Sequence, residues 1–106
     1  LGNSGSFFKN PIISKTEFKK IHPQFPDMKF FEVSATEVKV PAGWLIEQAG
    51  FKGKRFGDAG VHKNQALVLV NYGNATGQEI LAVSKKIQDT VYNTFGIHIE
   101  AEVNVI

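Results

Sequence analysis

The segment from Thr76 to Gly96 constrains the fold most, because it carries the complete pattern of one long amphipathic helix. Thr76 and Glu79 have the spacing of a capping box, in which each residue satisfies a backbone amide of the other. Gly96 is the residue type that most often ends a helix. Between these ends, apolar residues recur at helical spacing, at Ile80, Val83, Ile87 and Val91. We therefore expect one helix over residues 77–95 that packs a single face on a sheet.

Strand patterns flank this helix on both sides. Residues 66–70 are the most hydrophobic run of the chain, and their valine content predicts a central strand covered on both faces. Residues 97–105 alternate, with Ile97 and Ile99 on one face and His98 and Glu100 on the other. These patterns predict an α+β fold: a small mixed β-sheet with the long helix and shorter helices packed against it.

Shorter elements are expected before residue 51. Ser14 and Glu17 form a second capping box, which predicts a short helix that stops before Pro23. Pro41 and Gly50 are the residue types typical of the start and the end of a helix, and they predict a second short helix between them. The other expected elements are a strand end at residues 12–13 and short strands at 30–33 and 37–40. Residues 51–60 are rich in glycine and basic residues, but they match neither a phosphate loop nor a dinucleotide fingerprint.

Length and composition narrow the class of protein. A chain of 106 residues forms a single domain, and 42% hydrophobic with 21% charged residues is typical of a globular protein. No run is long enough to span a membrane and no signal peptide is visible, so we expect no membrane partner. The chain has no cysteine, which fits a cytoplasmic location. Because it opens with Leu1 and ends on a strand pattern, we expect it to be a piece of a longer protein.

The charge pattern argues against a nucleic-acid partner. The net charge of +2 is too small for binding driven by phosphate neutralisation. A local basic cluster remains, which we define as Lys52, Lys54, Arg55 and Lys63, and it is either a solvated surface or a site for an anion. The three histidines, at positions 22, 62 and 98, share no ligand spacing, so no metal site is expected.

The two ends of the chain hold the candidate site residues. Residues 2–11 combine glycine, serine, asparagine and lysine with two adjacent phenylalanines. This mixture suits a loop in which Phe7 and Phe8 anchor the backbone while polar groups face a ligand, but composition alone favours a plain polar turn with an aromatic anchor. Glu100 and Glu102 lie two apart near the other end. Either both are solvated or one is aimed at a site, and periodicity does not choose.

Four stretches together resemble a known family. They are Gly5–Pro11 (G-S-F-F-K-N-P), Ala42–Gln48, the stretch 57–65 and Glu100–Val103, in this order. The order closely resembles the C-terminal domain of the UDP-N-acetylenolpyruvoylglucosamine reductase (MurB) family over essentially the whole chain. The resemblance implies a flavoenzyme in which NADPH reduces FAD, and the flavin passes hydride to UDP-N-acetylglucosamine enolpyruvate. It also implies that two upstream domains, absent from this chain, hold the FAD.

The resemblance implies a role for each of four residues. Ser6 stands where the family has the general acid that protonates the enolate carbon after hydride addition. Glu102 stands where the family has a catalytic glutamate beside the substrate carboxylate. Asn10 and Gln65 stand at positions similar to those that hold the UDP diphosphate. Ala101 replaces a proline found in many members, and alanine keeps the strand alternation.

Two other functions remain open at this point. The first is a non-enzymatic module that binds a nucleotide or another anion through the basic cluster, and the second is a purely structural α+β domain. The resemblance favours the oxidoreductase of peptidoglycan synthesis over both.

Overall fold

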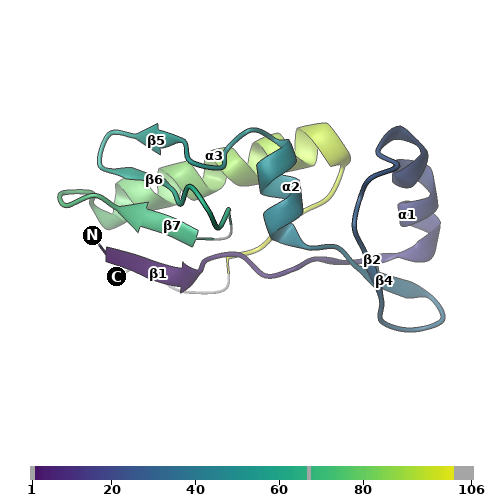
Figure 1. Ribbon diagram of the computed structural model, residues 1–106. Helices are drawn as coiled ribbons and strands as arrows, with labels where there is room; N and C mark the ends of the chain where they lie inside the picture. Colours follow the sequence, from purple (N-terminus) through teal and green to yellow (C-terminus); the bar gives the residue numbers. More distant parts are fainter. Residues whose placement is uncertain (1, 67, 102–106) are drawn as a thin grey trace.

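The computed structural model describes residues 2–66 and 68–101, with the backbone alone for residues 2–6. Within these residues the strands form two small antiparallel sheets, and three α-helices pack around them (Figure 1). The first sheet has the order β1-β7-β6-β5 and consists of β1 (Gly2–Ser6), β7 (Val68–Asn71), β6 (Ala59–Val61) and β5 (Arg55–Phe56). The expected α+β class is confirmed.

The long helix and the central strand are as the sequence predicts. Helix α3 (Gly77–Phe95) begins with the capping box of Thr76 and Glu79, and Gly96 ends it in the left-handed conformation at φ 73°. It buries Val83, Ile87, Val91 and Phe95. Strand β7 lies between β1 and β6, and its residues 68–70 are all buried. In Figure 1, α3 runs along one face of the first sheet.

Residues 12–40 fold as a separate layer at the other end of the molecule (Figure 1). Strands β2 (Ile12–Ser14), β4 (Glu37–Lys39) and β3 (Phe31–Glu32) form the second sheet in the order β2-β4-β3. Between β2 and β3 lie α1 (Lys15–Ile21), capped by Ser14, and the 3-10 helix η1 (His22–Gln24). The predicted short helix and both predicted short strands are therefore present.

Helix α2 (Ala42–Gln48) joins the two layers. Leu45 and Ile46 of this helix are fully buried, and Trp44 contacts Phe95 of α3 with ring centroids 5.8 Å apart. Phe25, which follows η1, packs on the same ring at 4.6 Å. Because these contacts connect residues of both layers, one continuous apolar core runs through the described part of the chain.

Three details differ from the sequence predictions. The strands divide into two antiparallel sheets instead of one mixed sheet, because β7 pairs with β1 and β6, whereas β4 pairs with β2 and β3. Residues 2–6, expected as a loop, form β1 for the same reason. Residues 55–61, where the sequence predicted no strand, form the β5–β6 hairpin around Gly57 at φ 65°.

The last predicted strand, residues 97–105, is described only as far as residue 101, and residues 97–100 do not form a regular strand. Ile97 and Ile99 are buried while His98 and Glu100 are exposed, so the alternation is confirmed over these four residues. Ala101 makes an isolated antiparallel bridge with Phe8. Residues 102–105 of the prediction lie outside the described residues. None of the helices in the described ranges has the length and apolar character needed to cross a membrane.

Gly60 should be the least replaceable residue of the β5–β6 hairpin. A Cβ at this position would lie 2.7 Å from the backbone oxygen of Lys54 and 3.2 Å from the ring of Tyr72. Because backbone has to move, we expect Gly60→Ala to lower the free energy of unfolding by about 1–3 kcal/mol in urea denaturation. Gly77→Ala, at the first residue of α3, is the matched control and should be neutral or slightly stabilising. Equal effects of the two substitutions would contradict the close packing at Gly60.

Candidate functional site

The backbone of Ser6 is fixed at the end of a strand. Ser6 is the last residue of β1, and it lies opposite Val68 of β7. The register shifts between Asn3 and Ser6, which marks an irregularity of the kind that re-aims a strand near its end. Position 6 is therefore held by the first sheet and not by a free loop.

The two phenylalanines after Ser6 anchor the chain, as the sequence predicts. Phe7 and Phe8 each have only 1% of their surface exposed. Their ring centroids lie 5.1 Å apart in an edge-on arrangement. Since both rings belong to the core, the backbone on either side of them has little freedom, and Ser6 precedes the first ring directly.

A short antiparallel contact brings the end of the described chain to this anchor. Phe8 pairs with Ala101, and the backbone N–H of Lys9 donates to the carbonyl of Glu100 at 2.8 Å. Phe8 and Lys9 thus lie beside Glu100 and Ala101, although more than 90 residues separate the two pairs in the chain. Glu102, the candidate glutamate, lies outside the described residues.

Gln65 lies in the turn between β6 and β7 and is exposed. Its carbonyl accepts the backbone N–H of Val68 at 3.0 Å. Val68 is also the residue that faces Ser6 across the sheet. The structure therefore brings the turn of Gln65 to the β1–β7 edge where Ser6 ends its strand.

Asn10 has a structural contact that the sequence did not suggest. Its side-chain Oδ1 accepts the backbone N–H of Ala42 at 2.9 Å. Ala42 is the first residue of α2, where backbone donors have no partner within the helix. Asn10 therefore ties the N-terminal segment to the start of α2 while its residue surface stays exposed.

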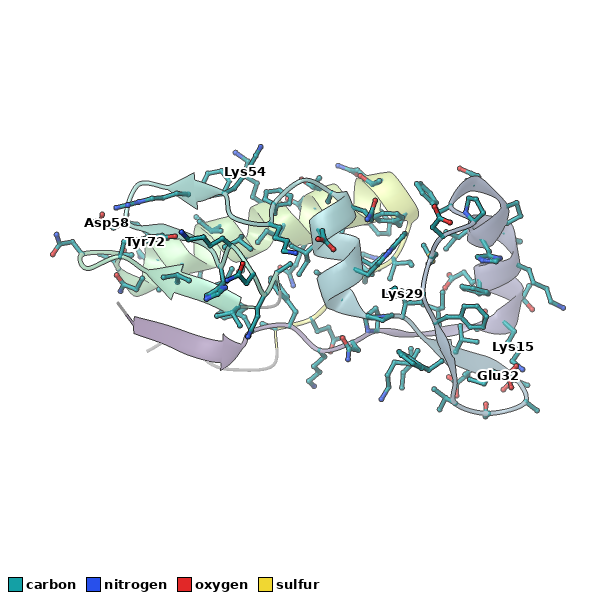
Figure 2. All side chains as sticks on the ribbon, viewed as in Figure 1. Lys15, Lys29, Glu32, Lys54, Asp58 and Tyr72 are labelled. Carbon is teal, nitrogen blue, oxygen red and sulfur yellow. The ribbon has the colours of Figure 1, made fainter. Side chains whose placement is uncertain are left out.

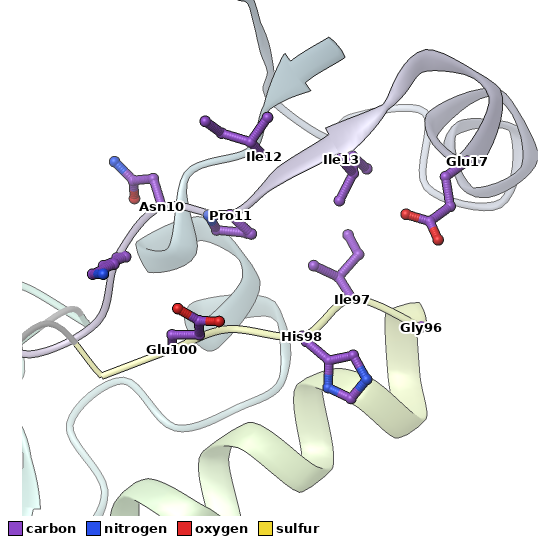
Figure 3. Close-up of a pocket in the computed structure, with 10 residues that line it drawn as sticks. Asn10, Pro11, Ile12, Ile13, Glu17, Gly96, Ile97, His98 and Glu100 are labelled. Atoms are coloured by element: carbon purple, nitrogen blue, oxygen red, sulfur yellow. The ribbon is translucent and has the colours of Figure 1, made fainter. Parts of the chain in front are cut away.

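A groove of about 440 Å³ runs beside these segments. One side comes from the N-terminal segment and the start of α1, and the other comes from the residues that follow α3 (Figure 3). Apolar residues form much of its wall, and Lys9, Glu17, His98 and Glu100 contribute charged or titratable groups. A second groove, of about 490 Å³, lies between α3 and the segment 98–99.

The basic cluster is not a set of four independent cations. Lys52 donates to the carboxylate of Glu47 at 2.8 Å. Arg55 donates to Asp58 at 3.1 Å, and its guanidinium lies over the ring of Tyr72 at 4.0 Å. Figure 2 labels Asp58 and Tyr72, the two partners of Arg55. Two of the four cations therefore have a carboxylate partner, which lowers the net positive charge of the cluster.

Two residues that hold site segments escaped the sequence analysis. The imidazole Nδ1 of His62 accepts the backbone N–H groups of Asn64 and Gln65. The side-chain amide of Gln88, on α3, donates to the carbonyl of Ile99 at 2.8 Å. Because contacts of this kind are made to backbone atoms, no residue spacing or motif predicts them. Within the described ranges, no group of three histidine or acidic residues comes together as a metal site would require.

The fold and the site define a small α+β domain whose N-terminal segment pairs with β7, next to the turn of Gln65, and also contacts the residues after α3. Residues 1–106 match the family model described as the C-terminal domain of UDP-N-acetylenolpyruvoylglucosamine reductase. The chain belongs to this family and corresponds to that domain.

Relatives named UDP-N-acetylenolpyruvoylglucosamine reductase agree with this assignment. The Flavobacterium johnsoniae protein is 83% identical over 106 residues, which are 100% of this chain and 32% of the relative. A Bacteroides fragilis protein is 48% identical with the same coverage of both chains. The Pseudomonas putida protein is 50% identical over 105 residues, covering 99% of this chain and 31% of the relative. The chain thus spans about a third of the length of these relatives.

Proposed function

We propose that this chain is the single-domain C-terminal part, residues 1–106, of a reductase that converts UDP-N-acetylglucosamine enolpyruvate to UDP-N-acetylmuramate. The reaction belongs to cytoplasmic peptidoglycan synthesis, on which cell-wall biogenesis, cell shape and cell division depend. The observation that carries the proposal is the match to the family over the whole chain, together with 83% identity to a relative that bears the enzyme's name.

Ser6 is the proposed general acid. Hydride addition to the enolpyruvyl double bond leaves negative charge on the carbon that bears the carboxylate, and a proton must reach that carbon. A serine hydroxyl is a weak acid, so it has to be held at the right place beforehand. The pairing of β1 with β7 and the two buried phenylalanines that follow Ser6 support this role, since they fix its backbone. After the transfer, the hydroxyl regains a proton from water.

Glu102 is the proposed partner of Ser6 at the substrate carboxylate. Two like charges would repel there, so we infer that Glu102 is protonated or is balanced by a cation. The bridge between Phe8 and Ala101 supports the pairing, because it brings the neighbour of Glu102 in sequence close to the segment that starts at Ser6.

The cofactors, FAD and NADPH, belong to the part of the enzyme outside this chain. The glycine-rich residues 53–60 do not fit a dinucleotide, because their backbone groups pair with each other in the β5–β6 hairpin. We therefore propose that upstream domains of the same polypeptide hold FAD, whose reduced form supplies the hydride. This chain contributes substrate contacts and the proton.

Asn10 and Gln65 are the proposed contacts of the UDP diphosphate, and Asn10 allows a separate test. Asn10→Asp keeps an oxygen that can accept the N–H of Ala42 but places a negative charge beside the phosphates. We expect an unchanged free energy of unfolding and a KM for the UDP substrate raised at least about tenfold in the full-length reductase. Asn10→Ala removes the acceptor and should also destabilise the protein by about 1 kcal/mol. An unchanged KM in Asn10→Asp would contradict the phosphate contact.

A domain exchange tests the function directly. In the full-length Flavobacterium johnsoniae reductase, this chain would replace the segment to which it is 83% identical. We expect the hybrid to bind FAD and to oxidise NADPH in a manner that depends on UDP-N-acetylglucosamine enolpyruvate. A hybrid that folds and is reduced by NADPH, but does not turn over this substrate, would reject the proposal.

The isolated chain distinguishes the enzyme from the anion-binding module. We expect it to show no bound FAD and no turnover, because both need the missing domains. The anion-binding module would bind simple polyphosphates and lose this binding in Lys54→Ala and Lys63→Ala. The reductase proposal instead expects both variants to leave the binding of the UDP-sugar unchanged.

A further inference from the structure

The imidazole of His62 accepts two hydrogen bonds from the turn that carries Gln65. Its Nδ1 lies 3.0 Å from the backbone nitrogen of Asn64 and 3.2 Å from that of Gln65. Both partners are amide donors, so these two hydrogen bonds require an Nδ1 without a proton, as in the tautomer that carries its hydrogen on Nε2. One side-chain atom therefore orders two consecutive residues of the turn.

The backbone of His62 is itself held on both sides. Its N–H donates to the carbonyl of Val68 at 2.9 Å, and its carbonyl accepts the N–H of Gly53 at 3.3 Å. The ring thus projects from a residue fixed between the end of β6 and the start of β7. Gln65, in contrast, is exposed and lies in the turn between these strands.

We propose that His62 is a positioning residue that orients the turn of Gln65 for the UDP diphosphate. This inference rests on the proposed function, in which Gln65 contacts the diphosphate. Without the two hydrogen bonds to Nδ1, the turn would sample other conformations, and substrate binding would have to order it again. His62 itself does not touch the substrate; it acts through the backbone of Gln65.

Three substitutions of His62 separate the acceptor from the bulk of the ring. Asparagine can place its Oδ1 near the position of Nδ1, whereas glutamine places its oxygen near the position of Nε2, and alanine has no acceptor. In the full-length reductase, we expect His62→Ala and His62→Gln to raise the KM for UDP-N-acetylglucosamine enolpyruvate by about 5- to 20-fold. We expect kcat to change less than about twofold, because the turn of Gln65 is proposed to contact the diphosphate and not the reacting carbon. His62→Asn should restore a KM within about threefold of the original.

Controls tie the effect to Gln65. Reduction of the flavin by NADPH should be unchanged in all His62 variants, and Lys63→Ala, in the same turn, should have the original KM. The double variant His62→Ala/Gln65→Ala should be no worse than Gln65→Ala alone, since both remove the same contact. Independent, additive losses would overturn the proposal.

The experiments distinguish a wrong role for His62 from a wrong assignment of Gln65 in the proposed function. A raised KM in Gln65→Ala with an unchanged KM in His62→Ala would overturn the role of His62 alone. An unchanged KM in Gln65→Ala would show that the assignment of Gln65, and with it the role of His62, is wrong. Nitrogen NMR of the histidine-labelled, full-length reductase checks the geometry without activity: His62 should have an unprotonated Nδ1 and a protonated Nε2. The opposite tautomer would also overturn the proposal.

Discussion

In a full-length reductase that contains this chain, Ser6→Ala should leave the reduction of FAD by NADPH intact and slow the reduction of the enolpyruvyl substrate by about 10²- to 10⁴-fold. This range is the usual contribution of a positioned general acid. The enzyme would still bind its substrate, but the carbanion-like centre that hydride addition creates would lack its proton donor. Anaerobic stopped-flow absorbance of the flavin separates the two half-reactions.

The surroundings of Ser6 make this result easy to interpret. Its backbone belongs to β1 and pairs with Val68, and the next residue, Phe7, is buried. Removal of one hydroxyl should therefore leave the strand and the anchor in place. Ser4→Ala removes the same group from the same strand and serves as the control, with both half-reactions expected at their original rates. A Ser6→Ala enzyme with normal substrate reduction would exclude Ser6 as the acid.

The sequence predicted those elements whose signals are local. Helix α3 has a capping box, an apolar stripe and a terminal glycine, and the structure places its ends at the predicted residues. Residues 68–70 of strand β7 are a continuous apolar run, and the strand lies between two others in its sheet. In both segments, neighbouring residues alone determine the periodicity and the ends, so no knowledge of distant partners is needed.

The elements that the sequence missed depend on distant partners. Residues 2–6 have the composition of a turn, but they form β1 because the exposed edge of β7 offers them hydrogen-bond partners some 65 residues away. The hairpin at residues 55–61 lies in a glycine-rich segment, and its two strands are only two and three residues long. Such short strands carry almost no periodic signal. The division into two sheets has the same origin, since pairing partners are a property of the whole fold.

The candidate site shows the same limit. Residue types alone left Ser6 in a polar turn and left Glu100 and Glu102 equivalent, and the resemblance to the family singled out Ser6 and Glu102. Neither the residue types nor the resemblance showed how the two ends of the chain are connected. The structure shows it in the backbone contacts that join Phe8 to Ala101 and Lys9 to Glu100. His62 and Gln88 escaped detection because their side chains bond to backbone atoms.

The two glutamates near the end of the chain provide the sharpest remaining test. Glu102→Gln keeps the size of the side chain and its capacity for hydrogen bonds, but it cannot exchange a proton. We expect it to slow substrate reduction in the full-length reductase by about 10²-fold or more, with flavin reduction by NADPH unchanged. The measurement is the same stopped-flow experiment that separates the half-reactions of the Ser6 variant.

Glu100→Gln is the matched control, because it makes the same chemical change two residues away. Glu100 is exposed beside the 440 Å³ groove, and only its backbone carbonyl takes part in the contact with Lys9. Its variant should therefore reduce the substrate at the original rate. If Glu100→Gln lost activity and Glu102→Gln kept it, the catalytic carboxylate would be Glu100 and the assignment of Glu102 would be wrong. If both variants were active, neither glutamate would be needed for catalysis, and the proposed role of Glu102 would be wrong.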